Sequence, residues 1–168
     1  MERPECARFA TTILHSVSFA DLGPIDPKLI TFDRHFSDDE KKDRWVRIVA
    51  PSGADGVVEK REAEGPAPVH SALAVFASLL SPSRTLTHTL PADDGSHLPR
   101  KVYIHVAQKS GYNTGKASGA TVRLSSKDGS VVEVHEGDGV YIMGDAGATL
   151  TVQNVGDRVA EVLLFDCC

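Results

Sequence analysis

Aromatic residues, cysteines and an excess of basic charge are all scarce in this 168-residue chain. Aromatic residues make up 6% of the sequence, which is too few for the repeated stacking platforms that bind single-stranded nucleic acid. Lysine and arginine number 18 against 23 acidic residues, giving a net charge of −5, and they are scattered along the chain. Nucleic-acid-binding modules usually carry a basic stripe, so we expect no nucleic-acid partner.

Long apolar runs are also missing. No run approaches the roughly 20 residues that span a bilayer, and the acidic stretch at residues 1–6 lacks the layout of a secretory signal. We therefore expect no membrane partner. The three cysteines, Cys6, Cys167 and Cys168, are an odd number and lie outside the expected core segments, which favours a reducing compartment. We expect a cytoplasmic protein, with the nucleus as the alternative.

Motifs for covalent catalysis are absent as well. The sequence contains no Gly-x-Ser-x-Gly elbow, and its cysteines lie far from any internal activating partner. Acyl transfer through a covalent nucleophile is therefore disfavoured. What remains is a balanced composition, with 41% apolar and 24% charged residues, which is typical of one globular domain.

The chain divides into an irregular N-terminal segment and a single domain. Residues 1–36 form the irregular segment, because glycine and proline interrupt any periodic pattern there. We expect the domain over residues 37–168, beginning with a helix over 37–49. Ser37 and Glu40 have the spacing of a capping box, and Pro51 follows the expected end of the helix.

From residue 57 onward the sequence is rich in short β-forming runs that are separated by turn residues. The expected strands are 57–62, 71–80, 85–90, 101–108, 120–125, 130–134, 139–143, 148–152 and 159–165. Asp128 and Gly129 form a strong hairpin signal, because both residue types tolerate a positive φ. Short strands at this even spacing predict an all-β fold, either an antiparallel sandwich or a barrel.

His88, His105 and Tyr103 are the candidate catalytic residues. Tyr103 and His105 share one face of the expected strand 101–108, and the apolar residues of that strand share the other face. If the polar face lines the interior of the fold, a phenol and an imidazole enter an enclosed space, where such groups perform acid–base chemistry near neutral pH. The alternative is that this face points to water.

Trp45, Tyr141 and Arg123 are the candidate substrate contacts. For Trp45 and Arg123 the sequence also supports a simpler, structural interpretation. Trp45 lies on the apolar side of the expected helix, so it packs on the domain body unless it stacks on a ligand. Arg123 and Glu133 alternate with apolar residues on neighbouring strands, which favours a solvent-facing ion pair between them.

Three stretches resemble a known family. Residues 100–106, 136–140 and 160–166 look like the C-terminal cupin half of pirin-like proteins, which are related to quercetin 2,3-dioxygenases. The resemblance covers roughly residues 28–166. It implies a single cupin barrel of the jelly-roll-like, double-stranded β-helix type, with one N-terminal helix and room for one ligand.

The resemblance also bears on metal binding. The second cupin motif, Gly-x5-Pro-x-Gly-x2-His-x3-Asn, aligns with residues 139–154 and keeps its glycines and Asn154, but Leu150 stands at the position of the metal histidine. Of the first motif, His88 matches one histidine, and Leu90 stands at its partner position. Leucine cannot donate to a metal, so the resemblance implies no metal and no cofactor.

The first functional hypothesis is a metal-free cupin that binds a small aromatic or polyketide-like molecule. His88, His105 and Tyr103 then make it a cofactor-independent acid–base enzyme that catalyses a cyclisation or an isomerisation.

Two other hypotheses belong to different classes. The second is a non-catalytic co-regulator or protein-interaction module, including a homodimer, which an apolar patch within residues 9–32 would favour. The third is a metal-dependent, quercetinase-like dioxygenase with ligands gathered from His70, His88, His105 and Glu133.

Overall fold

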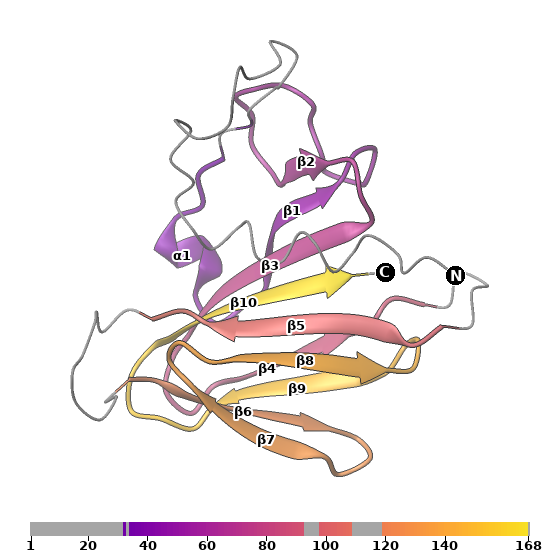
Figure 1. Cartoon of the computed structure of the whole chain (residues 1–168). Helices are drawn as coiled ribbons and strands as arrows, with labels where there is room; N and C mark the ends of the chain where they lie inside the picture. Colours follow the sequence, from indigo (N-terminus) through magenta and orange to yellow (C-terminus); the bar gives the residue numbers. More distant parts are fainter. Residues whose placement is uncertain (1–31, 33, 93–97, 109–118, 168) are drawn as a thin grey trace, which may run out of the picture. The chain divides into compact units, whose positions relative to one another are not determined.

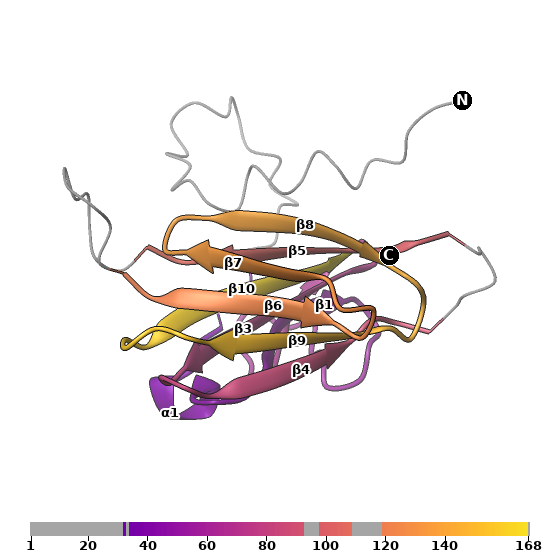
Figure 2. The same cartoon turned by 90° about the horizontal axis from the view of Figure 1, so that it is seen from below.

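The computed structural model describes residues 32, 34–92, 98–108 and 119–167, which form two facing β-sheets preceded by a short helix (Figure 1). The six-stranded sheet has the order β2 (Ala67–Val69), β1 (Val46–Pro51), β3 (Leu73–Leu80), β10 (Ala160–Cys167), β5 (Arg100–Val106), β8 (Gly139–Gly144). The four-stranded sheet has the order β4 (Thr85–Thr89), β9 (Thr149–Asn154), β6 (Thr121–Ser126), β7 (Val131–His135). All of these neighbours pair antiparallel except β1 and β2, and the strands can be followed from a second side in Figure 2.

The core lies between the two sheets and follows the two-residue period of the strands. On β5, Val102, Ile104 and Val106 are fully buried, and on β10 the same holds for Val162 and Leu164. The facing strands β6 and β9 contribute Val122, Leu124, Leu150 and Val152 to the same cluster. Burial of one such side chain contributes about 1.5–3 kcal/mol to folding, so the inward residues determine the register of both sheets.

The expected strands from residue 71 onward are confirmed, each with bounds that agree to within about two residues. The hairpin signal is also confirmed. The Ser126 amide donates to the Ser130 carbonyl at 3.1 Å, and Gly129 has a φ of +90° between β6 and β7. The all-β, jelly-roll-like architecture expected from the sequence is therefore present. Among the described residues, no helix is long and apolar enough to cross a bilayer.

The expected helix begins at the right place but is much too long. The helix α1 covers only Asp38–Lys41, and its capping box is present, with the Ser37 amide donating to Glu40 at 2.7 Å. The Ser37 hydroxyl, which donates to the same carboxylate at 2.7 Å, and the Ser37 amide together lower the pKa of the Glu40 carboxyl. Residues 42–45 form a turn, and from Val46 onward the chain forms β1, because its β-branched residues can pair with β3 on one side and β2 on the other.

The expected strand 57–62 is wrong. These residues connect β1 to β2 and form no strand, since Glu62 alone among them takes part in a β-bridge, and β2 lies instead at Ala67–Val69. Gly53 and Gly56, with φ values of +82° and +77°, turn the chain away from the sheet before Val57. The expected irregular segment 1–36 lies outside the described residues up to position 31, and residues 34–36 form no helix or strand.

Asn154 ties three parts of the fold together at the end of β9. Its side chain is fully buried, and its Nδ2 donates to the carbonyls of Leu80 at 2.8 Å and Arg158 at 2.7 Å. Its Oδ1 accepts from the Gly156 amide at 3.0 Å. Every polar atom of this amide is therefore matched, which explains how a polar residue can occupy a core position.

Replacement of Asn154 by alanine is expected to lower the free energy of unfolding by about 2–4 kcal/mol, because three backbone groups lose their partner. Urea denaturation measures the change. The matched control is Gln153→Ala, on the opposite face of β9, where we expect less than about 1 kcal/mol. Equal losses in the two variants would contradict the role assigned to Asn154.

Candidate functional site

A buried histidine–carboxylate pair bridges the two sheets. His88 points inward from β4, and Asp166 points inward from β10. The His88 Nε2 lies 2.9 Å from the Asp166 Oδ2, and the two residues are 9% and 4% exposed. An ionised carboxylate only accepts hydrogen bonds, so with Asp166 ionised the imidazole donates from Nε2 and its Nδ1 carries the lone pair.

Two aromatic side chains surround this pair. The Phe76 ring of β3 meets the His88 ring edge-on with 5.1 Å between centroids, and the Trp45 ring does so at 6.5 Å. Both aromatic residues are half-buried, and they lie beside a histidine that is almost enclosed. Arg47 lies opposite Phe76 in the β1–β3 register and donates to the Asp55 carbonyl. Phe76 and Trp45 together form what we call the aromatic rim of the His88–Asp166 pair.

Two polar atoms of the site are buried without a hydrogen-bond partner among the described residues. They are the Asp166 Oδ1 and the Trp45 Nε1. A buried polar atom without a partner costs about 1–3 kcal/mol, and native proteins rarely tolerate one without a reason. The Asp166 oxygen can accept, and the Trp45 nitrogen can donate, a hydrogen bond to a small polar group that enters the site.

The structure places Leu150 directly opposite His88 in the β4–β9 register. This is the position at which the cupin motif carries a metal histidine. In the described part of the chain, no three histidine, cysteine or acidic side chains gather into a possible metal site. His88 and Asp166 supply two donors, and Leu150 supplies none, so the side chains at this position do not fit a cupin metal centre.

The expectation that Tyr103 and His105 line the interior with His88 is wrong. The inward positions of β5 are the even-numbered ones, so Tyr103 and His105 lie on the outer face of the six-stranded sheet. Their rings stack there with centroids 6.4 Å apart, and the Tyr103 ring lies 5.8 Å from that of Phe165. The three candidate catalytic residues therefore do not share a site.

The candidate substrate contacts are also separated. Tyr141 lies opposite Tyr103 in the β5–β8 register and is 58% exposed, on the outer face. Arg123 pairs with Glu133 at 2.7 Å on the exposed side of β6 and β7, so the solvent-facing ion pair is confirmed. Trp45 packs against the core, as the simpler interpretation has it, and it also lies beside His88.

The four residues named as alternative metal ligands do not come together. His70 is exposed after β2, His88 lies between the sheets, His105 lies on the outer face, and Glu133 belongs to the ion pair with Arg123. The four residues lie on different faces and different strands, so the metal-ligand set proposed from the sequence is wrong. The apolar patch expected within residues 9–32 lies almost wholly outside the described residues, because position 32 alone is described there.

Sequence analysis missed Asp166 and Phe76 as members of the site. Asp166 has a signal that could have revealed it. It is a carboxylate at an even-numbered position of the strand in which Ala160, Val162 and Leu164 point into the core. A charged residue in phase with a core stripe needs a buried partner. Phe76 has no such signal, because one more apolar residue on a central strand looks like ordinary core.

Comparison with known proteins finds similar solved structures. No protein-family model matches the chain, and no curated protein matches its sequence. Among solved structures, the chain is similar to YhhW from Escherichia coli, with 21% identity over 74% of this chain and a TM-score of 0.48. The match spans 38% of the length of YhhW, a protein also solved as a bacterial pirin in complex with nickel(II).

Cupin domains from other bacteria are similar as well. One is a Cupin 2 conserved barrel domain protein from Salinispora arenicola, with 14% identity, 74% of this chain, 75% of that chain and a TM-score of 0.41. Another is the cupin_2 domain of an XRE family transcriptional regulator from Enterobacter cloacae, with 14% identity, 57% of this chain, 81% of that chain and a TM-score of 0.40. A bacterial pirin and cupin_2 domains are therefore among the structural neighbours of this chain. Its two facing sheets form the all-β, jelly-roll-like architecture that was expected from the sequence.

A double-mutant cycle measures how strongly the buried pair is coupled. We expect His88→Leu and Asp166→Leu each to lower the free energy of unfolding by about 3–5 kcal/mol, because each leaves the other polar group unpaired in the core. The double variant is expected to cost at least about 2 kcal/mol less than the sum. Urea denaturation supplies the four values.

Arg123→Ala and Glu133→Ala form the control cycle, with an expected coupling energy below about 1 kcal/mol. If the effects of His88→Leu and Asp166→Leu are additive, the two residues are not coupled.

The variant Leu150→His tests the account of the metal position. It places a second imidazole across from His88 and beside Asp166, and three such donors suit divalent transition metals. We expect it to bind Ni²⁺ at least about tenfold more tightly than the unchanged chain, as measured by isothermal titration calorimetry. Thr151→His, on the outer face of the same strand, is the control and should gain nothing. Equal affinity in the two variants would show that Leu150 does not occupy a metal position.

Proposed function

We propose that this cupin domain binds a small aromatic or polyketide-like molecule at the rim formed by Trp45 and Phe76 and transfers a proton on it through His88. The observation that carries the proposal is the buried His88–Asp166 pair, with 2.9 Å between Nε2 and Oδ2. Histidine is the side chain that most often performs general acid–base chemistry, and a carboxylate at one ring nitrogen sets which nitrogen is protonated. No metal takes part in the proposed reaction, because the donor set at this position is incomplete.

The preference for a flat ligand follows from the rim. Phe76 and Trp45 are half-buried and lie next to a nearly enclosed imidazole, and flat apolar molecules bury much area against aromatic rings. The buried Trp45 Nε1 and Asp166 Oδ1, which have no described partner, suit a ligand with both a carbonyl and a hydroxyl group. A phenol or an enolisable aromatic ketone combines these features.

The proposed mechanism uses one imidazole rather than three residues. Nδ1 of His88 takes the proton of a phenol or enol oxygen, and the resulting imidazolium is stabilised by the Asp166 carboxylate at Nε2. The electron pair of the broken O–H bond moves into the conjugated ligand and forms a carbonyl. His88 then returns the same proton to a ring or side-chain carbon, which completes an isomerisation. General acid–base catalysis of this kind contributes about 10²–10⁴-fold to a rate.

A phenolic probe tests this proposal without knowledge of the natural ligand. 7-Hydroxycoumarin is flat, and its excitation spectrum distinguishes the phenol from the phenolate. We expect it to quench the fluorescence of Trp45, which is the single tryptophan of the chain, and to bind as the phenolate. His88→Gln is expected to keep the quenching and to lose the phenolate signal at the same pH.

The matched control is His105→Gln, which removes an imidazole from the outer face and should change neither signal. If the probe binds the unchanged chain as the neutral phenol, or if His88→Gln leaves the phenolate signal intact, His88 is not the base. Absence of quenching would remove the binding site at the rim.

A further inference from the structure

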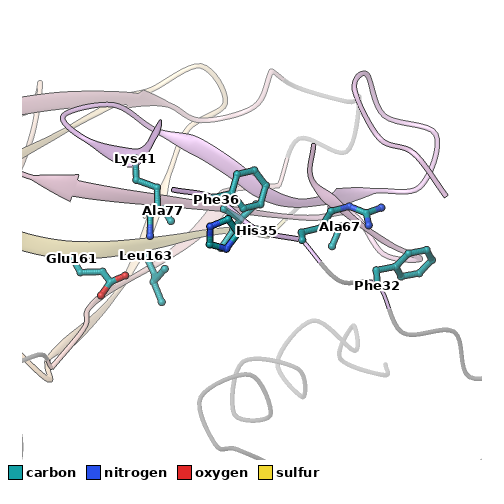
Figure 3. Close-up of a pocket in the computed structure, with 10 residues that line it drawn as sticks. Phe32, His35, Phe36, Lys41, Ala67, Ala77, Glu161 and Leu163 are labelled. Atoms are coloured by element: carbon teal, nitrogen blue, oxygen red, sulfur yellow. The ribbon is translucent and has the colours of Figure 1, made fainter. Parts of the chain in front are cut away.

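A separate cavity lies on the other side of the six-stranded sheet. It has a volume of about 460 Å³, is partly open to solvent, and lies between the chain around α1 and the outer face of the sheet (Figure 3). Ala77 of β3 and Leu163 of β10 line it, and they are the sequence neighbours of Phe76 and Leu164, which point into the core. This volume falls within the range of about 300–1,000 Å³ that is usual for small-molecule sites.

The wall of the cavity is held in place by specific contacts. The Arg34 guanidinium donates to three backbone carbonyls of the loop before β2, those of Val58 at 2.7 Å, Lys60 at 3.0 Å and Arg61 at 3.0 Å. After α1, the Asp43 amide donates to the Leu79 carbonyl of β3 at 3.0 Å. The segment that covers the sheet is therefore fastened at both ends, so the cavity is largely preformed.

Small and aromatic residues shape the interior. Ala67 and Ala77 provide a floor with little side-chain volume, and Phe32 and Phe36 provide flat apolar walls. In Figure 3, Lys41 and Glu161 lie at one end, Phe32 lies at the other, and His35 and Phe36 lie between them. The cavity is thus elongated, with Lys41 and Glu161 at one end and the Arg34 guanidinium over the Phe32 ring at the other.

Lys41 is the cation best placed to hold an anionic group there. Its side chain is 17% exposed, and its Nζ lies 3.3 Å from Asp38, whose side chain is 82% exposed. Such an exposed partner is weakly held, so a carboxylate inside the cavity can replace it at Nζ. The lining as a whole carries two basic side chains, Arg34 and Lys41, against the single carboxylate of Glu161.

We propose that this cavity is a second ligand site, which takes an aromatic carboxylate with its ring between His35 and Phe36 and its carboxylate at the Lys41 Nζ. The site goes beyond the proton transfer proposed at His88, from which it is separated by the thickness of the sheet. Its ligand need not be the molecule on which His88 acts, and neither proposal depends on the other.

The test uses 2-naphthoate and its uncharged analogue 2-naphthamide, with binding followed by nuclear magnetic resonance on the ¹⁵N-labelled full chain. We expect 2-naphthoate to bind with shifts at Phe36, Ala77 and Leu163, and 2-naphthamide to bind about tenfold more weakly, because charge-assisted hydrogen bonds are the stronger ones. Lys41→Gln is expected to abolish this difference while keeping the affinity for 2-naphthamide. Ala67→Leu, which fills the floor, should weaken both probes about tenfold.

Ala72→Leu, at an exposed position before β3, is the matched control for added volume and should leave both affinities unchanged. Ala77→Leu replaces Ala67→Leu if that variant does not fold. His88→Gln should also leave both affinities unchanged, which separates this site from the proposed proton transfer. Absence of binding, equal affinity for the two probes, or unchanged binding in the floor variant would each overturn the proposal.

Discussion

The two-residue period of the central strands determines which chemistry can occur where in this domain. On β10, the even-numbered residues from Ala160 to Asp166 point into the core, and the odd-numbered ones point out. A shift of register by one residue would exchange the two sets and place a carboxylate outside and Phe165 inside. Inward packing of the apolar residues is therefore what brings Asp166 to His88. The buried pair exists because the core around it has only one acceptable register.

Much of the fold could be predicted from the sequence because local signals and burial agree there. Hairpin residues such as Asp128 and Gly129 and the alternating strands from residue 71 onward specify their own structure. The segment after α1 shows where local signals are insufficient. Its capping box starts a helix, but Ile48 and its neighbours gain more from pairing with β3 and β2 than from continuing that helix. Such a tertiary preference has no signature within the segment itself.

The candidate site was harder to predict, because a residue belongs to it only if its side chain lies on the buried face of its strand. Tyr103 and His105 alternate with apolar residues, and the period alone does not say which set faces the core. The answer comes from the partner strands, since Ile104 and Val106 pair with the buried Leu164 and Val162 of β10 and pack in the same core cluster as the facing sheet. His88 lies on a strand whose other inward residue, Leu86, is only partly buried, so its sequence context is weak. The pairing register between strands that are distant in sequence determines where Tyr103, His105 and His88 lie. No short motif encodes that register.

The same strands carry both proposed sites, one on each face. On β3, Phe76 contacts His88, and its neighbour Ala77 lines the outer cavity. On β10, Leu163 lines that cavity, and Asp166 holds the imidazole three residues later. A substitution on either strand therefore cannot be assigned to one site by its sequence position alone. The face of the sheet on which a side chain lies decides which of the two sites it affects. Adjacent residues on β3 and β10 lie on opposite faces, so they should affect different ligands.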